Sequence, residues 1–161
     1  MTLIFVDVEA VGATPTTGLM TEFGAVEYKT RQYFHGKIYR TRPSKENAAI
    51  PEILGVHRSL PEVMEDFSEW IKEITPDYRA TFVSDNPAYD FMWIACAFDK
   101  HDMANPFGHS ARRIGDFYAG LKNDFFTRQD WKNLRITKHD HNPVNDAMGN
   151  VEAMHQLLQG G

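Results

Sequence analysis

The chain has 161 residues, of which 42% are hydrophobic and 24% are charged, and it carries a net charge of −5. This composition is ordinary for a soluble globular protein, and the length predicts a single domain over residues 1–161. The single cysteine excludes an intrachain disulfide framework, which fits a reducing compartment. No apolar run reaches the roughly 18 residues that a membrane-spanning helix needs. The N-terminus also lacks a signal-peptide pattern, so a cytoplasmic protein is expected.

The first part of the chain has the pattern of strands. Thr2–Val8 is a continuous apolar run rich in β-branched and aromatic residues, which is typical of a central strand. A loop rich in glycine, proline and threonine follows over Gly12–Gly18. Glu22–Tyr28 and Tyr33–Tyr39 are predicted to be the second and third strands, and the polar turn between them indicates an antiparallel meander.

Helices and strands then alternate. Apolar residues recur at helical spacing over Pro61–Ile74, and the dipeptides Asn86-Pro87 and Asn142-Pro143 are typical helix starts, with asparagine at the cap and proline in the first turn. The elements predicted here are a helix over Pro61–Ile74, a strand over Arg79–Ser84, and helices from Asn86 through Phe98, over Asp116–Leu121, and from Asn142 to Gln159. A meander followed by such an alternation predicts an α/β fold, with a mixed sheet flanked by helices.

Two acids lie inside the first predicted strand. Asp7 and Glu9 are separated by one residue, so both side chains project from the same face of a strand. Burying an unpaired carboxylate costs several kcal/mol or raises its pKa until it is neutral. The apolar run around these acids therefore indicates that another group compensates for their charge, unless the strand is an edge strand with one face in solvent.

Two further acids lie in the first turns of predicted helices. Asp90 follows the Asn86-Pro87 start, and Asp146 follows Asn142-Pro143, with His141 five positions before it. Either acid taken alone is explained by its favourable interaction with the positive end of a helix dipole.

Together these motifs resemble the DEDDh family of 3′–5′ exonucleases in the ribonuclease H-like superfamily, which includes polymerase proofreading domains, oligoribonuclease and ribonuclease T. FVDVEAVG resembles the first motif, SDNPAYD the second and HNPVNDA the third, and their order holds from Leu3 to Leu158. The chain departs from the family in having Ala10 and Val11 where threonines are common, and in its prolines, Pro87 and Pro143. The resemblance implies a ribonuclease H-like sheet, in which an antiparallel meander is joined to parallel strands and flanked by helices.

The resemblance also implies hydrolysis of single-stranded RNA or DNA from the 3′ end to nucleoside 5′-monophosphates, with two metal ions. The expected ligands are Asp7, Glu9, Asp90 and Asp146. Hard oxygen ligands suit Mg²⁺ or Mn²⁺. Two such ions would neutralise four of the net negative charges, which weakens the objection that an acidic chain is a poor partner for nucleic acid.

Two histidines precede the third motif. His141 is the candidate general base, because an imidazole titrates near pH 6.5 and can accept a proton from water at neutral pH. His139 lies seven residues before Asp146, which is not the family spacing, and is expected to be solvated.

Substrate contacts are predicted in two regions. The segment that precedes His141 interleaves aromatic and cationic residues, among them Arg128 and Trp131, and we expect it to border the substrate channel. The alternative is that its aromatic residues belong to the core. The resemblance places the terminal nucleotide against residues of the first two motifs, namely Ala10, Val11, Gly12, Asn86 and Tyr89.

Two other functions are compatible with parts of the sequence. A catalytically inactive nucleic-acid or partner-binding module would share the fold, although all four acids and the histidine are present. A histidine–aspartate phosphohydrolase of small nucleotides could use His139, Asp140 and His141, but that class is all-helical, and the predicted strands argue against it. The sequence leaves open the choice between RNA and DNA, and also a homodimer, which some relatives form.

Overall fold

The structure is a computed structural model that describes residues 2–38, 58–75 and 79–160. Its centre is a sheet with the strand order β3-β2-β1-β4-β5. The strands are β1 (Thr2–Val11), β2 (Leu19–Glu27), β3 (Tyr33–Lys37), β4 (Ala80–Ser84) and β5 (Ala111–Arg113). The β1–β2 and β2–β3 pairs are antiparallel, whereas the β1–β4 and β4–β5 pairs are parallel. This mixed sheet confirms the predicted fold class.

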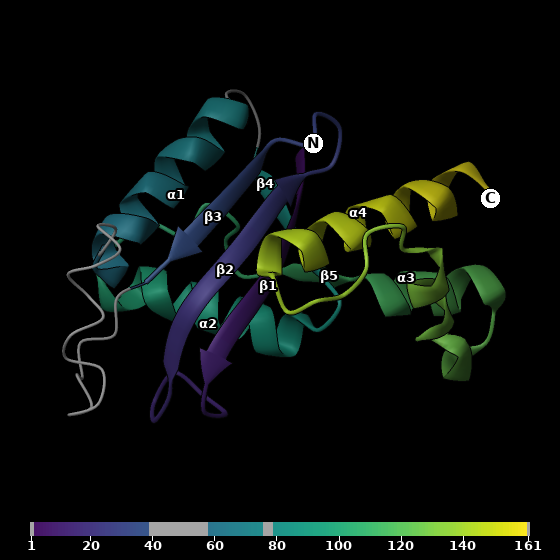
Figure 1. Cartoon of the computed structure of the whole chain (residues 1–161), viewed down its shortest axis with the longest axis horizontal. Coiled ribbons are helices and arrows are strands. Elements are labelled where there is room, and N and C mark those ends of the chain that lie inside the picture. Colours follow the sequence, from purple (N-terminus) through teal and green to yellow (C-terminus); the bar gives the residue numbers. More distant parts are fainter. Residues whose placement is uncertain (1, 39–57, 76–78, 161) are drawn as a thin grey trace.

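Helices cover both faces of the sheet. The α-helices are α1 (Leu60–Ile74), α2 (Pro87–Lys100), α3 (Ile114–Lys122) and α4 (Pro143–Gln159), and the short 3₁₀ helices are η1 (Phe125–Thr127) and η2 (Asp130–Leu134). Figure 1 shows α4 crossing one face of the sheet, with α1 and α2 on the other side. Within the described ranges, none of these helices has the length and apolar character that a membrane span requires.

Most predicted elements are confirmed within a few residues, and the differences are local. The first strand continues to Val11, three residues beyond its predicted end. The three-residue strand β5 and the two 3₁₀ helices were not predicted. Tyr39, the predicted end of the third strand, lies outside the described residues.

The alternation along β1 determines which face its acids occupy. Ile4, Val6 and Val8 pack in the cluster formed with α1 and α2, whereas Phe5 packs in the cluster formed with α4. Because successive strand residues point to opposite faces, Asp7 and Glu9 share the face of Phe5. The two acids therefore project toward the side of the sheet that α4 covers.

A glycine allows the start of α4 to lie directly on the sheet beside Asp7. Gly24 on β2 pairs with Asp7 on β1. A Cβ atom at Gly24 would lie 2.3 Å from the backbone carbon of Pro143 and from the backbone nitrogen of Val144. Only a residue without a side chain permits this approach, which brings the first turn of α4 against the acids of β1.

We expect Gly24→Ala to displace the start of α4. The added methyl would overlap backbone atoms that cannot rotate away, so the stability should fall by about 1–3 kcal/mol. The matched control is Gly120→Ala on α3, where a Cβ atom would meet nothing within 4 Å. Thermal unfolding should be preserved in the control, and a Gly24→Ala variant as stable as the wild type would contradict the packing argument.

Candidate active site

The predicted acids converge at the end of β1 that meets the first turns of α2 and α4. Carboxylate oxygens of Asp7, Glu9 and Asp146 all lie within 4.8 Å of one another. Asp90, in the first turn of α2, is 5% exposed and accepts a hydrogen bond from the backbone nitrogen of Val8 at 3.3 Å. Four acids from three elements thus form one group, which we call the acidic cage (Asp7, Glu9, Asp90 and Asp146).

The electrostatics of the cage are unfavourable without a cation. Burial, followed by the negative charges of Asp90, Asp146 and Glu9, raises the pKa of Asp7 from 3.8 to about 8. Burial likewise raises the pKa of Asp90 to about 7. Atom Oδ2 of Asp146 is buried and makes no well-aligned hydrogen bond within the described residues, although Nδ1 of His139 lies 2.6 Å from it. Crowded, buried carboxylates are the arrangement that divalent cations would stabilise, so the residues present fit such ions.

The raised pKa values of Asp7 and Asp90 predict how the metal-free protein responds to pH. Between about pH 4 and pH 8 the folded protein retains protons on these groups that the unfolded chain has released. Stability should therefore be higher near pH 6 and fall as the pH rises through 7–8. Thermal unfolding in EDTA from pH 5.5 to 9 measures this, and saturating Mn²⁺ should flatten the dependence; a metal-free protein that gains stability over this range would contradict it.

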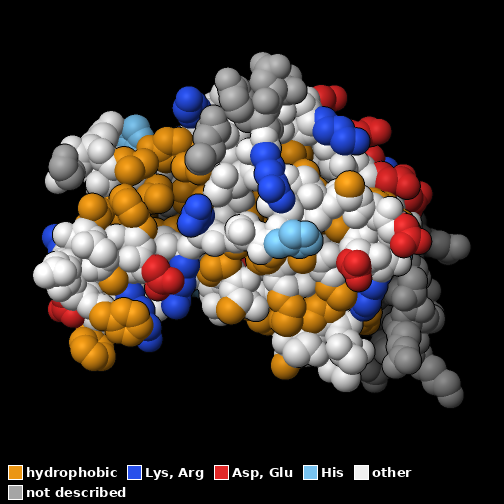
Figure 2. Space-filling view, turned by 180° about the vertical axis from the view of Figure 1, so that it is seen from behind, with side chains coloured by type: hydrophobic (Ala, Val, Ile, Leu, Met, Phe, Trp, Pro, Cys, Tyr) orange, Lys and Arg blue, Asp and Glu red, His pale blue; other side chains and the backbone are white. Residues whose placement is uncertain are grey.

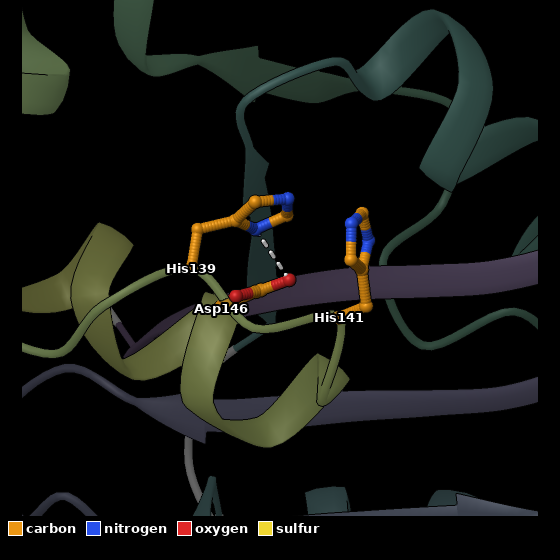
Figure 3. A group of neighbouring side chains, drawn as sticks. All are labelled: His139, His141 and Asp146. Carbon is orange, nitrogen blue, oxygen red and sulfur yellow. Dashed lines mark ion pairs between the residues drawn. The ribbon is translucent and has the colours of Figure 1, made fainter.

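Both histidines of the preceding loop face the cage. Figure 3 shows the Asp146 carboxylate lying between the rings of His139 and His141. Atom Nδ1 of His139 is 2.6 Å from Oδ2 of Asp146, and Nδ1 of His141 is 3.7 Å from Oε1 of Glu9. Their side chains are 51% and 77% exposed. His141 thus lies beside the acids as the motif predicts, while His139, expected to be solvated, is half exposed and contacts Asp146.

The histidine loop is held against α4 by groups that the sequence analysis did not identify. The carboxylate of Glu152 accepts hydrogen bonds from the backbone nitrogens of Ile136 and Thr137, at 3.0 and 2.7 Å, and from the Thr137 hydroxyl at 2.9 Å. Nearer the histidines, Asp140 accepts from the backbone nitrogen of Asn142 at 2.9 Å. His141 itself has a φ of 62°, in the left-handed region. These contacts position the backbone of the loop that carries the two histidines.

The end of β1 is also shaped by an irregularity in the sheet. The register between β1 and β2 shifts after Glu9, and Thr21 on β2 donates its hydroxyl hydrogen bond to the Glu9 carbonyl oxygen at 3.0 Å. Bulges of this kind redirect side chains and are common beside active sites. Nothing in the sequence pattern indicated this one.

Cationic side chains flank the cage on the side of β4. Lys132 lies 2.6 Å from the Asp85 carboxylate, and Arg135 lies 3.8 Å from it. The positive charge of Arg135 partly offsets the rise in the pKa of Asp7, so its guanidinium acts on the cage. The segment expected to border the substrate channel therefore brings Arg135 within electrostatic reach of the cage and places Lys132 against Asp85, just beyond β4.

Other predictions for this segment have mixed outcomes. The prediction that Trp131 contacts the substrate is wrong, because its side chain is fully buried in the α4 cluster, with the Arg135 guanidinium 4.9 Å from its ring. Phe125 and Phe126 are 64% and 91% exposed, so the core alternative fails for them. Figure 2 shows hydrophobic side chains at the surface at the end of the molecule where α3 lies, and the half-buried Arg128 stacks over Phe125 at 4.9 Å.

The remaining substrate candidates are neighbours of the acids in the sequence. Ala10, Val11 and Gly12 continue directly from Glu9, and Val11 is 57% exposed. Asn86 occupies the cap position of α2, but its side chain makes no capping hydrogen bond and is exposed. Tyr89 is half-buried, and its ring lies 6.0 Å from that of Trp93.

Comparisons with solved structures identify the same fold in known nucleases. The nuclease domain of 3'hExo, a DEDDh family member solved bound to rAMP, has a TM-score of 0.74 and 14% identity over 99% of this chain and 92% of that one. Cell-death related nuclease 4 (CRN-4) has a TM-score of 0.69 at 14% identity, over 99% of this chain and 64% of that one. The zinc-bound form of the E. coli ExoI–ssDNA complex has a TM-score of 0.57 and 14% identity, over 98% of this chain and 39% of that one.

The family comparison adds the activity. The sequence model of a family described as the 3'-5' exoribonuclease Rv2179c-like domain matches residues 2–158, nearly the whole chain. A search of curated proteins gives no significant match. The fold, the acidic cage and the family match define a 3′–5′ exonuclease. Within that class, the chain belongs to the family of Rv2179c-like 3'-5' exoribonuclease domains.

Proposed function

We propose that this exonuclease removes nucleoside 5′-monophosphates from the 3′ end of single-stranded RNA, with two divalent cations, Mg²⁺ or Mn²⁺, held by the acidic cage. The observation that carries the proposal is the convergence of Asp7, Glu9 and Asp146 within 4.8 Å, with buried Asp90 beside them. RNA is favoured over DNA by the description of the family to which the chain belongs.

The cations would lower the pKa of the attacking water and stabilise charge at the leaving 3′ oxygen. His141 accepts the proton of that water. Its ring is 77% exposed, so water and substrate can reach it, and Nδ1 lies 3.7 Å from Glu9, which orients the ring toward the cage. The Glu152 contacts hold the loop in this position, and the left-handed backbone of His141 directs the side chain back over β1.

The flanking residues suit the rest of a 3′ end. Arg135, whose charge acts on Asp7, would interact with phosphates entering the cage, and exposed Val11 would provide an apolar surface for the terminal nucleotide. Beyond them, Arg128 and the exposed Phe125 combine a cation with a stacking surface for upstream nucleotides. Trp131 takes no direct part and instead supports Arg135 from below.

A direct comparison of substrates tests the proposal. We expect 5′-labelled single-stranded RNA to be shortened stepwise in Mg²⁺ or Mn²⁺, at a rate at least tenfold above that on DNA of the same sequence. EDTA should stop the reaction, and a 3′-phosphate should block it. Equal rates on RNA and DNA would overturn the RNA assignment, whereas internal cleavage or activity in EDTA would overturn the mechanism.

A further inference from the structure

We propose that His139, His141 and Asp146 form a second metal site, which shares Asp146 with the acidic cage, and that Zn²⁺ bound there inhibits the exonuclease. The inhibitory part rests on the proposed function; the zinc site does not. The cage and this site meet at Asp146, which belongs to both groups of converging ligand atoms.

The geometry of the three side chains is that of an incomplete tetrahedral site. One ligand atom from each residue lies within 4.8 Å of the other two. The rings of His139 and His141 are 4.5 Å apart between centroids, and Figure 3 shows both facing the Asp146 carboxylate. Zinc bonds of about 2.0–2.1 Å require ligand atoms about 3.4 Å apart. Nδ1 of His139 and Oδ2 of Asp146 are 2.6 Å apart, so zinc binding requires the half-exposed His139 side chain to move outward.

The buried acid provides an independent indication of a ligand. Asp146 is 2% exposed, and its Oδ2 atom makes no well-aligned hydrogen bond in the part of the chain that the structure describes, although Nδ1 of His139 lies 2.6 Å from it. A buried carboxylate oxygen without a well-aligned donor is costly. A cation between this oxygen and the two imidazoles would satisfy it, and three protein ligands leave one position for water, as in many zinc sites.

The two groups of ligands differ in their metal preference. The cage offers oxygen atoms alone, which suit Mg²⁺ and Mn²⁺, whereas two imidazole nitrogens and one carboxylate suit Zn²⁺. Zinc also binds a given nitrogen-containing site more tightly than manganese does. Zinc at the histidine site would occupy a ring nitrogen of His141 and the Oδ2 atom of Asp146. His141 would then be unable to accept a proton, and Asp146 would be withdrawn from the cage.

The test uses the metal-free full chain and ZnCl₂ without nucleic acid. Calorimetry should show that His139→Ala weakens zinc binding at least tenfold, while His155→Ala, which changes a histidine hydrogen-bonded to Tyr28 and Gln159, has no effect. In NMR spectra, Zn²⁺ should shift the ring signals of His139 and His141 and leave those of His155 unchanged, and Mg²⁺ should not reproduce these shifts. Unchanged zinc affinity in His139→Ala, or unmoved His139 signals, would overturn the site.

A rate measurement tests the inhibition separately. For each variant, the zinc concentration that halves its own Mg²⁺-supported rate is determined, and this concentration should be at least tenfold higher for His139→Ala than for the wild type. Equal values would show that zinc inhibits through the cage alone and would overturn the inhibitory role. If the wild type binds zinc at the histidines but degrades no RNA in Mg²⁺, the proposed function fails and the zinc site stands.

Discussion

Asp7→Asn should lower the rate of RNA hydrolysis by at least about 10³-fold while making the metal-free protein more stable at pH 9. The rate falls because the cage loses a ligand. Metal ions stabilise the transition state by several kcal/mol, and each 1.36 kcal/mol corresponds to about a tenfold change in rate. Stability rises because burial and three neighbouring acids disfavour the charged form of Asp7, whose pKa is raised to about 8. An amide of the same size removes that charge.

Activity assays with Mn²⁺ and thermal unfolding in EDTA measure the two effects on one sample. Asp116→Asn is the matched control, because Asp116 lies in the first turn of α3 with a side chain 61% exposed. It should change neither quantity appreciably. An Asp7→Asn variant that keeps more than a tenth of the wild-type rate, or that is less stable at pH 9, would contradict the role of the cage.

His141→Ala should reduce the rate by about 10²–10⁴-fold at neutral pH, which is the usual contribution of a general base. The side chain is 77% exposed, so its removal should leave the fold intact. The variant should also lose the rising acidic limb of the pH–rate profile, since the proposed general base has been removed.

Two other histidines, His139 and His155, serve as comparisons that show whether His141 in particular is the general base. His139 lies 2.6 Å from Asp146, and His155 lies on α4 within hydrogen-bond distance of Tyr28. Each is changed to alanine and its pH–rate profile recorded beside that of His141→Ala. If His139→Ala, and not His141→Ala, abolishes the acidic limb, then the general base is His139. If neither does, the reaction needs no histidine base.

The sequence predicts the fold well where apolar periodicity is strong. The run from Thr2, the helical spacing in α1 and the two Asn-Pro starts each produce the expected element. The two helix starts differ in detail: Asn142 accepts hydrogen bonds from two backbone nitrogens of α4, but Asn86 caps nothing with its side chain. Strand β5 was missed because three residues, two of them arginine, carry no alternation and are recruited only by pairing with β4.

The sequence predicts those features of the candidate site that depend only on residues close together in the chain. Acids two apart on a strand share a face, so the sequence alone predicts that Asp7 and Glu9 lie together. The close approach at Gly24, the bulge at Thr21 and the Glu152 contacts depend on which segments meet in space, and no sequence pattern marks them. Trp131 was wrongly predicted for a related reason. An aromatic residue between cations has the same sequence pattern whether it stacks on a base or, as here, fills the core.

Asp7, Glu9, Asp90 and Asp146 should form one cage that is active only when it holds two cations. The most direct measurement is anomalous diffraction from crystals of the full chain soaked in MnCl₂ with a nucleoside 5′-monophosphate. The account predicts two manganese peaks about 3.5–4 Å apart, bounded by these four carboxylates. Crystals in which the four carboxylates diverge, or in which no manganese lies among them, would contradict it.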